Sequence, residues 1–274
     1  MSKENNNIRF DFIESVVWWE GQINATHLAT KFQLSRQAAS TVLQLYREKY
    51  PQNLRYNQSS KAFIATTEFN NQAKPSLFSN YLVLTTDSPQ NQQSVNVFAF
   101  EVEAPLRNIN PIQVRPILRA IREKLAIDIG YISLSSPDYL DRIIQPHALI
   151  FDGLRWHVRA FCNKNEQFRD FTLSRFNGEA TFEGKATHLS DQDEKWQTMV
   201  DVVIEADPRF NTQQKRIIEQ DFQMENGQKI INTRAALVNY LLRRLHIDSY
   251  KNTPEEQQIV LTSDSRKCIA PYLP

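Results

Sequence analysis

The spacing of apolar residues along this chain of 274 residues changes twice, and this change limits the folds open to it. Apolar residues recur at helical intervals up to about residue 50, alternate with polar residues from Ile127 to Gly184, and show both patterns after His188. Helical intervals predict amphipathic helices, whereas alternation predicts half-buried strands. We therefore predict a multidomain α+β protein with a helical unit, a small bent antiparallel sheet or barrel, and a compact α+β unit.

The length of the chain supports this division, because 274 residues exceed the usual size of one domain. A stretch that mixes Pro, Asn, Ser and Gln with short apolar runs indicates a connector, with a short helix near 76–84 and a strand near 95–102. The last unit is predicted to run strand, helix, helix, strand over 196–206, 212–222, 233–247 and 258–263. The four predicted segments are 1–70, the connector 71–110, 111–190 and 191–274.

Composition excludes several classes of protein. Hydrophobic residues at 41% and charged residues at 23% are typical of a globular chain. No apolar run approaches a spanning helix, and the polar start MSKENNN lacks the apolar stretch of a signal peptide, so we expect a cytoplasmic protein without membrane contact. The balance of 32 basic and 31 acidic residues argues against binding of nucleic acid by net charge, so any such affinity needs a local patch.

Cysteine and histidine usage predicts neither a disulfide scaffold nor a metal site. The only two cysteines, Cys162 and Cys268, are expected to be reduced, small core residues. The five histidines are scattered without the spacing of metal ligands. The phosphate-binding, zinc-protease and serine-hydrolase motifs are absent as well. We therefore predict a protein that is not an enzyme and that carries no cofactor.

Two helical segments near the N-terminus, joined by about three residues, indicate a helix-turn-helix. A first helix over 9–20 precedes them. Asn24 or Thr26 can cap the next helix, and Ser35 can cap the one after it. Gln33 occupies the turn position where Gly is more usual.

The second of these helices separates its apolar and polar side chains onto opposite faces. The polar side chains near its start are short enough to approach a major groove, where Arg and Gln reach base edges and Ser and Thr reach phosphates. A predicted hairpin over 54–66 follows, at the place of the wing in a winged helix. Taken by itself, the polar face fits a solvated helix surface equally well. The candidate DNA-binding residues are Ser35, Arg36, Gln37, Ser40, Thr41, Gln44, Arg55 and Lys61.

The strand GLRWHVRAF, residues 153–161, carries a row of cations. Side chains alternate between the faces of a strand, which predicts that Leu154 and Trp156 lie with Val158 and Ala160 in the core, opposite Arg155, His157 and Arg159. Guanidinium and hydroxyl groups gathered in a small barrel would suit a phosphate or a nucleotide. Taken singly, each is more often a surface ion-pair partner. The candidate ligand-binding residues are Tyr131, Ser133, Arg142, His147, Arg159, Arg169 and Arg175.

An enzymatic alternative comes from two short segments. Pro137-Asp138 and Glu183-Gly184-Lys185 superficially match the PD…ExK arrangement of metal-dependent nucleases, which needs carboxylates that converge on a divalent cation. Both segments also fit ordinary turns, as does Asn177-Gly178. We regard the turn interpretation as far stronger.

The order of residues over 127–176 resembles a known domain. DRIIQPHALIFDGLRWHVRAF followed by FRDFTLSRF resembles the WYL domain, whose Trp-Tyr-Leu triplet reads Trp156-His157-Val158 here. The whole chain resembles a WYL-domain transcriptional regulator with an N-terminal winged helix-turn-helix and a C-terminal extension. Within this family it resembles repressors encoded beside bacterial phage-defence systems such as BREX and CBASS. The matching positions are Tyr131, Arg142, Pro146, His147, Trp156, Arg169 and Arg175.

The resemblance implies a homodimeric repressor that binds an inverted-repeat operator in double-stranded DNA, since two-fold protein symmetry matches a palindrome. It also implies an Sm-like barrel that binds a nucleotide or nucleic-acid effector, and a C-terminal unit that dimerises. The leucine-rich face of 234–247 is a candidate contributor to the dimer, although core packing explains it equally well. The alternative is a non-regulatory single-stranded nucleic-acid binder or nuclease accessory that holds nucleic acid in the barrel.

Overall fold

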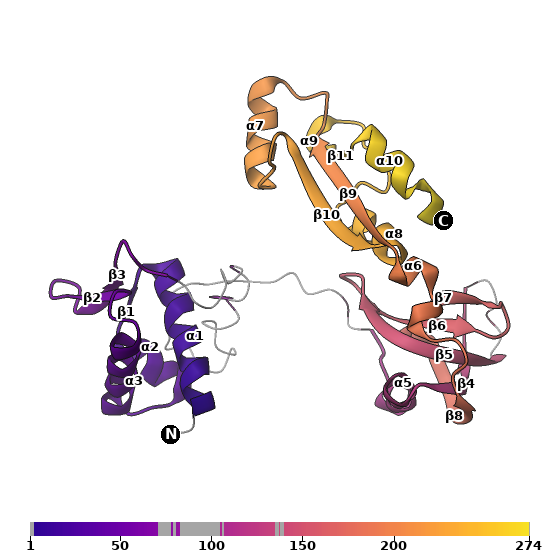
Figure 1. Ribbon diagram of the computed structural model, residues 1–274, viewed down its shortest axis with the longest axis horizontal. Helices are drawn as coiled ribbons and strands as arrows, with labels where there is room; N and C mark the ends of the chain where they lie inside the picture. The colour runs from indigo at the N-terminus through magenta and orange to yellow at the C-terminus, as the bar shows by residue number, and fades with distance from the viewer. Residues whose placement is uncertain are drawn as a thin grey trace. The chain divides into compact units, whose positions relative to one another are not determined.

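The computed structural model describes residues 3–70, 78, 81–82, 105, 107–134, 137 and 140–273. The chain divides into two compact units, Met1–Glu103 and Ala104–Pro274. Figure 1 draws the first unit in indigo and purple and the second from magenta to yellow. No helix in the described part of the chain is both long and apolar enough to cross a membrane.

The first unit is a winged helix-turn-helix, as the sequence predicts. Its described elements are α1 (Lys3–Glu20), β1 (Gln22–Ile23), α2 (Ala25–Phe32), α3 (Arg36–Lys49), β2 (Leu54–Asn57) and β3 (Ala62–Ala65). The strands pair in the antiparallel order β1-β3-β2. The structure adds β1, which the sequence analysis did not predict, and begins α1 before the expected Arg9.

Local capping fixes the geometry of the helix-turn-helix. Asn24 caps α2, because its side chain accepts a 2.9 Å hydrogen bond from the Thr26 amide, and Ser35 caps α3 by accepting one of 3.2 Å from the Ala38 amide. The structure thus selects Asn24 over Thr26 as the first cap. Gln33 ends α2 in the left-handed region, with φ 52°. Fully buried side chains, among them Leu28 and Val42, join the helices.

The middle sheet curls into a barrel-like shape. Its elements within the described ranges are α5 (Pro111–Glu123), β4 (Leu125–Tyr131), β5 (Leu140–Phe151), β6 (Trp156–Cys162), β7 (Gln167–Thr172), the 3-10 helix η1 (Leu173–Arg175) and β8 (Phe176–Lys185). The strands are antiparallel in the order β7-β6-β5-β4-β8. The edges of a flat five-stranded sheet would lie about 19 Å apart. The chain from Thr172 to Phe176 spans at most about 14 Å, so the sheet must bend to bring β7 and β8 together.

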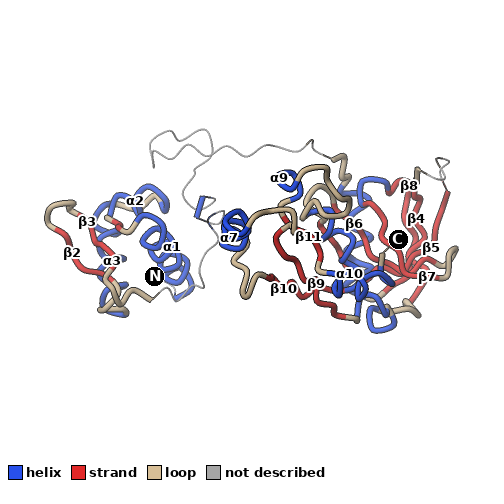
Figure 2. The backbone as a smooth tube through the Cα atoms, turned by 90° about the horizontal axis from the view of Figure 1, so that it is seen from above, coloured by secondary structure: helices blue, strands red, loops and turns tan. Residues whose placement is uncertain are grey.

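The C-terminal part of the second unit is a smaller sheet covered by helices. Its described elements are η2 (Ser190–Gln192), α6 (Glu194–Gln197), β9 (Met199–Ala206), α7 (Thr212–Asp221), β10 (Gln228–Arg234), η3 (Ala235–Leu237), α8 (Val238–Arg244), α9 (Pro254–Gln257), β11 (Ile259–Leu261), α10 (Ser263–Ile269) and η4 (Ala270–Tyr272). The strands pair in the antiparallel order β10-β9-β11. Figure 2 shows the two sheets of the second unit as separate groups of strands.

Strand β10 corrects the predicted order of this unit. The sequence analysis placed a helix over 233–247, but the chain stays extended through Arg234 and only Val238–Arg244 forms helix α8. The reason is tertiary pairing, because Ile231 and Thr233 lie opposite Val202 and Val200 of β9. In α8, Val238 and Leu242 are buried in the core of this sheet, so core packing accounts for these apolar residues.

Strand β6 departs from simple alternation. Trp156 was predicted in the core, yet it is 41% exposed and lies against Phe151, which is also exposed, with ring centroids 5.0 Å apart. Leu154 is exposed as well. Both residues belong to the β5–β6 hairpin end, beyond the reach of the core. Further along, both faces of β6 are buried, and His157 and Arg159 are each only 6% exposed.

Two smaller expectations also need revision, and a third is not tested. Cys268 is exposed, and only Cys162 is a core residue. Asn177-Gly178 is not a turn, because it lies inside β8 at an irregularity in the pairing with β4. The predicted helix near 76–84 and strand near 95–102 fall largely outside the described residues. Of these, Tyr81 is described and donates a 2.9 Å hydrogen bond to Glu20.

Gln33 provides a test of the turn geometry. Replacing it by Gly should stabilise the protein by about 0.5–1 kcal/mol, because Gly adopts left-handed backbone without the Cβ penalty. Gln44→Gly, in the exposed middle of α3, is the matched control and should destabilise by about 1 kcal/mol. Urea unfolding followed by circular dichroism measures both. Destabilisation by Gln33→Gly would contradict the left-handed turn.

Candidate functional site

The candidate DNA-binding residues lie at the surface of the winged helix. Helix α3 buries Ala39, Val42, Leu43 and Tyr46 on its inner side. The opposite side exposes the five predicted helix residues together with the cap residue Ser35. Intrahelical bonds order part of this face, since the Thr41 hydroxyl donates to the Gln37 carbonyl at 3.0 Å. The exposed residues on this side are Ser35, Arg36, Gln37, Ser40, Thr41 and Gln44.

The wing adds two exposed cations to this unit. Arg55 lies on β2, and Lys61 follows the β2–β3 turn with φ 50°. The turn is closed by Asn57, whose side chain accepts hydrogen bonds from the Ser59 and Ser60 amides. A closed turn holds both flanking cations on a rigid hairpin, which suits contact with phosphates.

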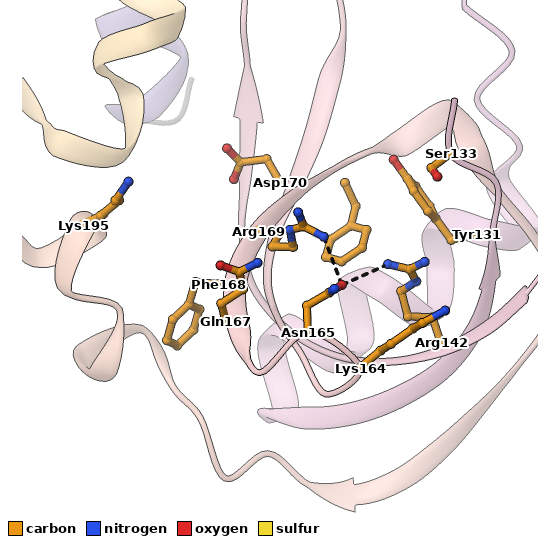
Figure 3. Close-up of a pocket in the computed structure, with 11 residues that line it drawn as sticks. Tyr131, Ser133, Arg142, Lys164, Asn165, Gln167, Phe168, Arg169, Asp170 and Lys195 are labelled. Carbon is orange, nitrogen blue, oxygen red and sulfur yellow. Dashed lines mark hydrogen bonds between the residues drawn. The ribbon is translucent and has the colours of Figure 1, made fainter. Parts of the chain in front are cut away.

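A pocket of about 660 Å³ opens on the middle sheet (Figure 3). Its described lining residues include four cations and one carboxylate, together with hydroxyl, amide and aromatic groups. This composition favours an anionic ligand that also offers surfaces for stacking. The lining residues are Tyr131, Ser133, Arg142, Lys164, Asn165, Gln167, Phe168, Arg169, Asp170, Phe171 and Lys195.

Two of the pocket arginines share a neutral acceptor. Arg142 and Arg169 each donate from Nη1 to Oδ1 of Asn165, at 3.5 and 3.0 Å, as the dashed lines in Figure 3 mark. The Arg142 guanidinium also lies over the rings of Tyr131 and Phe171, 5.7 and 5.8 Å from their centroids. In the described structure, Nε of Arg142 is buried without a hydrogen-bond partner. An amide balances no charge, so the two guanidinium groups keep their affinity for an anion.

The structure brings four of the seven candidate ligand-binding residues together and separates the other three. Tyr131, Ser133, Arg142 and Arg169 line the pocket. Arg175 does not line the pocket, because it lies in the 3-10 helix η1, where the alternation of strand side chains ends.

His147 and Arg159 are also outside the pocket lining, since both are held by a buried carboxylate. Arg159 donates from Nε and Nη2 to the two oxygens of Asp193 at 2.7 and 2.9 Å, and His147 Nε2 lies 3.1 Å from Asp193 Oδ2. A third hydrogen bond of Arg159, from Nη1 at 3.2 Å, goes to Asp170 across the β6–β7 pair. Arg159 is therefore a structural ion-pair residue and not an open cation.

The sequence analysis missed several lining residues for identifiable reasons. Lys164 and Asn165 come from the polar β6–β7 turn and Gln167 begins β7 directly after it, in a stretch whose composition marks only a loop. Asp170 was passed over because a lone carboxylate among cations gave no signal of its own. Lys195 comes from α6, and no sequence pattern connects that helix with the sheet.

Electrostatics keep the buried carboxylates ionised. Burial is the largest influence on the pKa of Asp193 and raises it, but hydrogen bonds from His147 and Arg159 outweigh burial and lower the pKa to about 2. Asp152 has a similar balance, with His157 Nε2 at 2.8 Å as its main partner, and its pKa is also lowered to about 2. His157 is thus a buried partner of Asp152.

The described residues give the nuclease interpretation no converged site. Glu183 and Lys185 are exposed on β8, and Asp138 lies outside the described residues. Within the described ranges, no group of three or more His, Cys, Asp and Glu side chains is arranged to hold a metal ion.

Comparisons with known proteins match every part of this architecture. Three family models match: the BrxR transcriptional regulator winged helix-turn-helix domain over residues 5–87, the WYL domain over 113–179, and the BrxR C-terminal dimerization domain over 199–273. The DNA-binding transcriptional repressor CapW of Pseudomonas aeruginosa is 35% identical over 92% of this chain and 87% of its own length. CapW of Escherichia coli strain KTE188 is 34% identical over 92% of this chain and 87% of its own length.

A solved structure of the proteasome accessory factor PafBC of Arthrobacter aurescens is also similar, at 18% identity. It covers 61% of this chain and 27% of its own, with a TM-score of 0.27.

Acid should weaken the second unit in a defined range of pH. Because the folded pKa values of Asp193 and Asp152 are depressed, each carboxylate contributes about 2 kcal/mol above pH 4, lost as the pH falls toward about 2. Urea unfolding between pH 2 and 6 measures this loss. Asp193→Asn should flatten the dependence, whereas Asp191→Asn, at an exposed neighbour, should not. Equal pH profiles for all three proteins would contradict the assignment.

Proposed function

This chain belongs to the family of WYL-domain transcriptional regulators that includes CapW and BrxR, and on that basis we propose that it is a DNA-binding transcriptional repressor. It acts as a homodimer on an inverted-repeat operator, and the regulated genes form a phage-defence operon. The observation that carries the proposal is the exposed polar face of α3 beside a wing with two cations.

The surface of α3 supports recognition of base sequence. Arg36 and Gln37 are exposed at the start of the helix, and both residue types form bidentate hydrogen bonds with base edges in the major groove. Ser40 and Thr41 are short enough to let the helix approach closely. Arg55 and Lys61 on the wing supply phosphate contacts, which position the helix without reading sequence.

Dimerisation is supported by the match of residues 199–273 to a C-terminal dimerization domain. Two winged helices related by a two-fold axis contact half-sites about one turn of DNA apart, or a multiple of it. A monomer would reach only one half-site, so dimerisation raises both affinity and selectivity for an inverted repeat.

We further propose that the pocket on the middle sheet binds a nucleotide or nucleic-acid effector. Arg142, Arg169 and the exposed Lys164 and Lys195 provide charge for phosphates, and Phe168 provides a ring for stacking. The effector controls the repressor by changing the separation of the two winged helices in the dimer. It must bind the two arrangements with different affinity, since otherwise it shifts neither population.

Arg36→Ala tests the DNA-binding face. Loss of one bidentate base contact should weaken binding to the inverted repeat upstream of the gene about tenfold, or about 1.4 kcal/mol, while the dimer persists. Fluorescence anisotropy measures affinity, and light scattering measures mass. Lys267→Ala removes a cation that is 81% exposed in the C-terminal unit and should leave affinity unchanged. Equal binding of wild type to a scrambled sequence would favour the non-regulatory alternative.

Arg169→Ala tests the effector pocket. The variant should bind the operator with wild-type affinity, but release by a short single-stranded oligodeoxynucleotide should need about tenfold more of the oligonucleotide, because one phosphate contact is lost. Arg175→Ala is the matched control, since Arg175 lies outside the pocket. A wild-type response in Arg169→Ala would show that the pocket does not bind the effector.

A further inference from the structure

The carboxylate of Asp170 belongs both to the pocket and to a buried network outside it. Asp170 lines the pocket, where Figure 3 places it beside Arg169. Its Oδ1 accepts a 3.2 Å hydrogen bond from Nη1 of Arg159, and its Oδ2 accepts one of 2.9 Å from the hydroxyl of Tyr240. Each oxygen of this pocket residue is therefore bound to a residue that is not part of the pocket.

The Tyr240 contact leads directly into the C-terminal part of the unit. Tyr240 lies on α8, and its hydrogen bond to β7 joins residues 70 positions apart in the chain. Its ring also packs against His157 of β6, with centroids 5.0 Å apart. Burial and the neighbouring Asp170 carboxylate raise the pKa of the Tyr240 hydroxyl, which keeps it a donor. Helix α8 is thus docked on the middle sheet through one face of β6 and β7.

The Arg159 contact leads to the same part of the unit by a second route. Arg159 holds Asp193, which caps α6 by accepting from the Trp196 amide at 3.2 Å. The Trp196 carbonyl in turn accepts a hydrogen bond from Arg234 at the end of β10, whose guanidinium lies 4.8 Å from the Trp196 ring centroid. Figure 1 shows α6 where the two sheets of the second unit meet.

Helix α6 also contributes to the pocket directly, through Lys195. The pocket wall therefore includes two groups, the Asp170 carboxylate and the Lys195 ammonium, that are tied to the elements around β9 and β10. An anionic ligand in the pocket repels the Asp170 carboxylate and attracts the Lys195 ammonium.

An anion in the pocket has a predictable effect on Asp170. Negative charge bound by Arg142 and Arg169 repels the Asp170 carboxylate, which lines the same pocket. Asp170 responds by moving away from the anion, and this movement alters its bonds to Arg159 and Tyr240. The Arg159 guanidinium is buried and also binds Asp193. Loss of its bond to Asp170 therefore changes the charge balance among Arg159, Asp170 and Asp193.

We propose that Asp170 is the residue through which an anion in the pocket changes the docking of the C-terminal domain, with Tyr240 as the contact that transmits the change. This inference rests on the proposed function for the presence of an effector. Asp170 lines the pocket, whereas Arg159 and Tyr240 lie outside the lining and position the Asp170 carboxylate. By thermodynamic reciprocity, loosening the contact at Tyr240 also changes the affinity of the pocket for its ligand.

The test compares Tyr240→Phe and Asp170→Asn with wild type in the full-length dimer. Tyr240→Phe removes only the hydroxyl and keeps the ring against His157, so folding is preserved. Hydrogen exchange of α8, read by mass spectrometry, should rise about tenfold in both variants without any ligand, because a charge-assisted hydrogen bond is lost or weakened. Tyr250→Phe is the matched control, since Tyr250 is 63% exposed in the same domain, and it should leave α8 exchange unchanged.

A second measurement adds a short single-stranded oligodeoxynucleotide as the probe. In wild type the probe should raise the exchange of α8, whereas in Tyr240→Phe it should bind the pocket yet change α8 exchange less than threefold. Unchanged α8 exchange in both ligand-free variants would overturn the coupling. So would a full probe response in Tyr240→Phe. If wild type does not bind the probe, the proposed effector class is wrong, and the ligand-free comparison still decides the coupling.

Discussion

The bidentate ion pair between Arg159 and Asp193 is the interaction on which the second unit depends. It joins the centre of the middle sheet to the cap of α6, at the entrance to the C-terminal sheet, and both residues are almost fully buried. Burial of one cation with two carboxylates is costly unless every oxygen finds a donor. Asp170 and Asp193 meet this condition through Arg159, Tyr240 and His147. The result is a junction whose contacts specify how the two sheets meet.

The arginines of the middle sheet differ in whether a carboxylate of the protein neutralises them. Arg159 is neutralised inside the protein, whereas Arg142 and Arg169 share only the neutral amide of Asn165 and retain their charge toward the pocket. A cation that no carboxylate of the protein neutralises remains available to bind an anion in the pocket. The division explains how a chain with a formal net charge of only +1 presents a concentrated cationic site.

The sequence predicted the winged helix well and the pocket in part. Asn24 and Ser35 are side-chain caps whose effect is local, so the helix boundaries near them follow from neighbouring residues. The failures have tertiary causes. Arg159 was assigned to an open face by alternation alone, whereas α6 and α8 cover that face of β6. Trp156 lies at the end of the β5–β6 hairpin, beyond the core. Pairing with β9 keeps Thr233 and Arg234, the start of the expected helix, in strand β10.

The sequence by itself determined most of the elements, although not β1 or β10, because hydrophobic period and capping act over a few residues. It also determined the surface of α3, where exposure follows from the helical period. Only the tertiary structure decided which charges face a ligand and which are paired inside. The fate of a cation depends on the nearest carboxylate in space, and Asp193 is 34 positions from Arg159 in the chain. No periodic pattern encodes that neighbour.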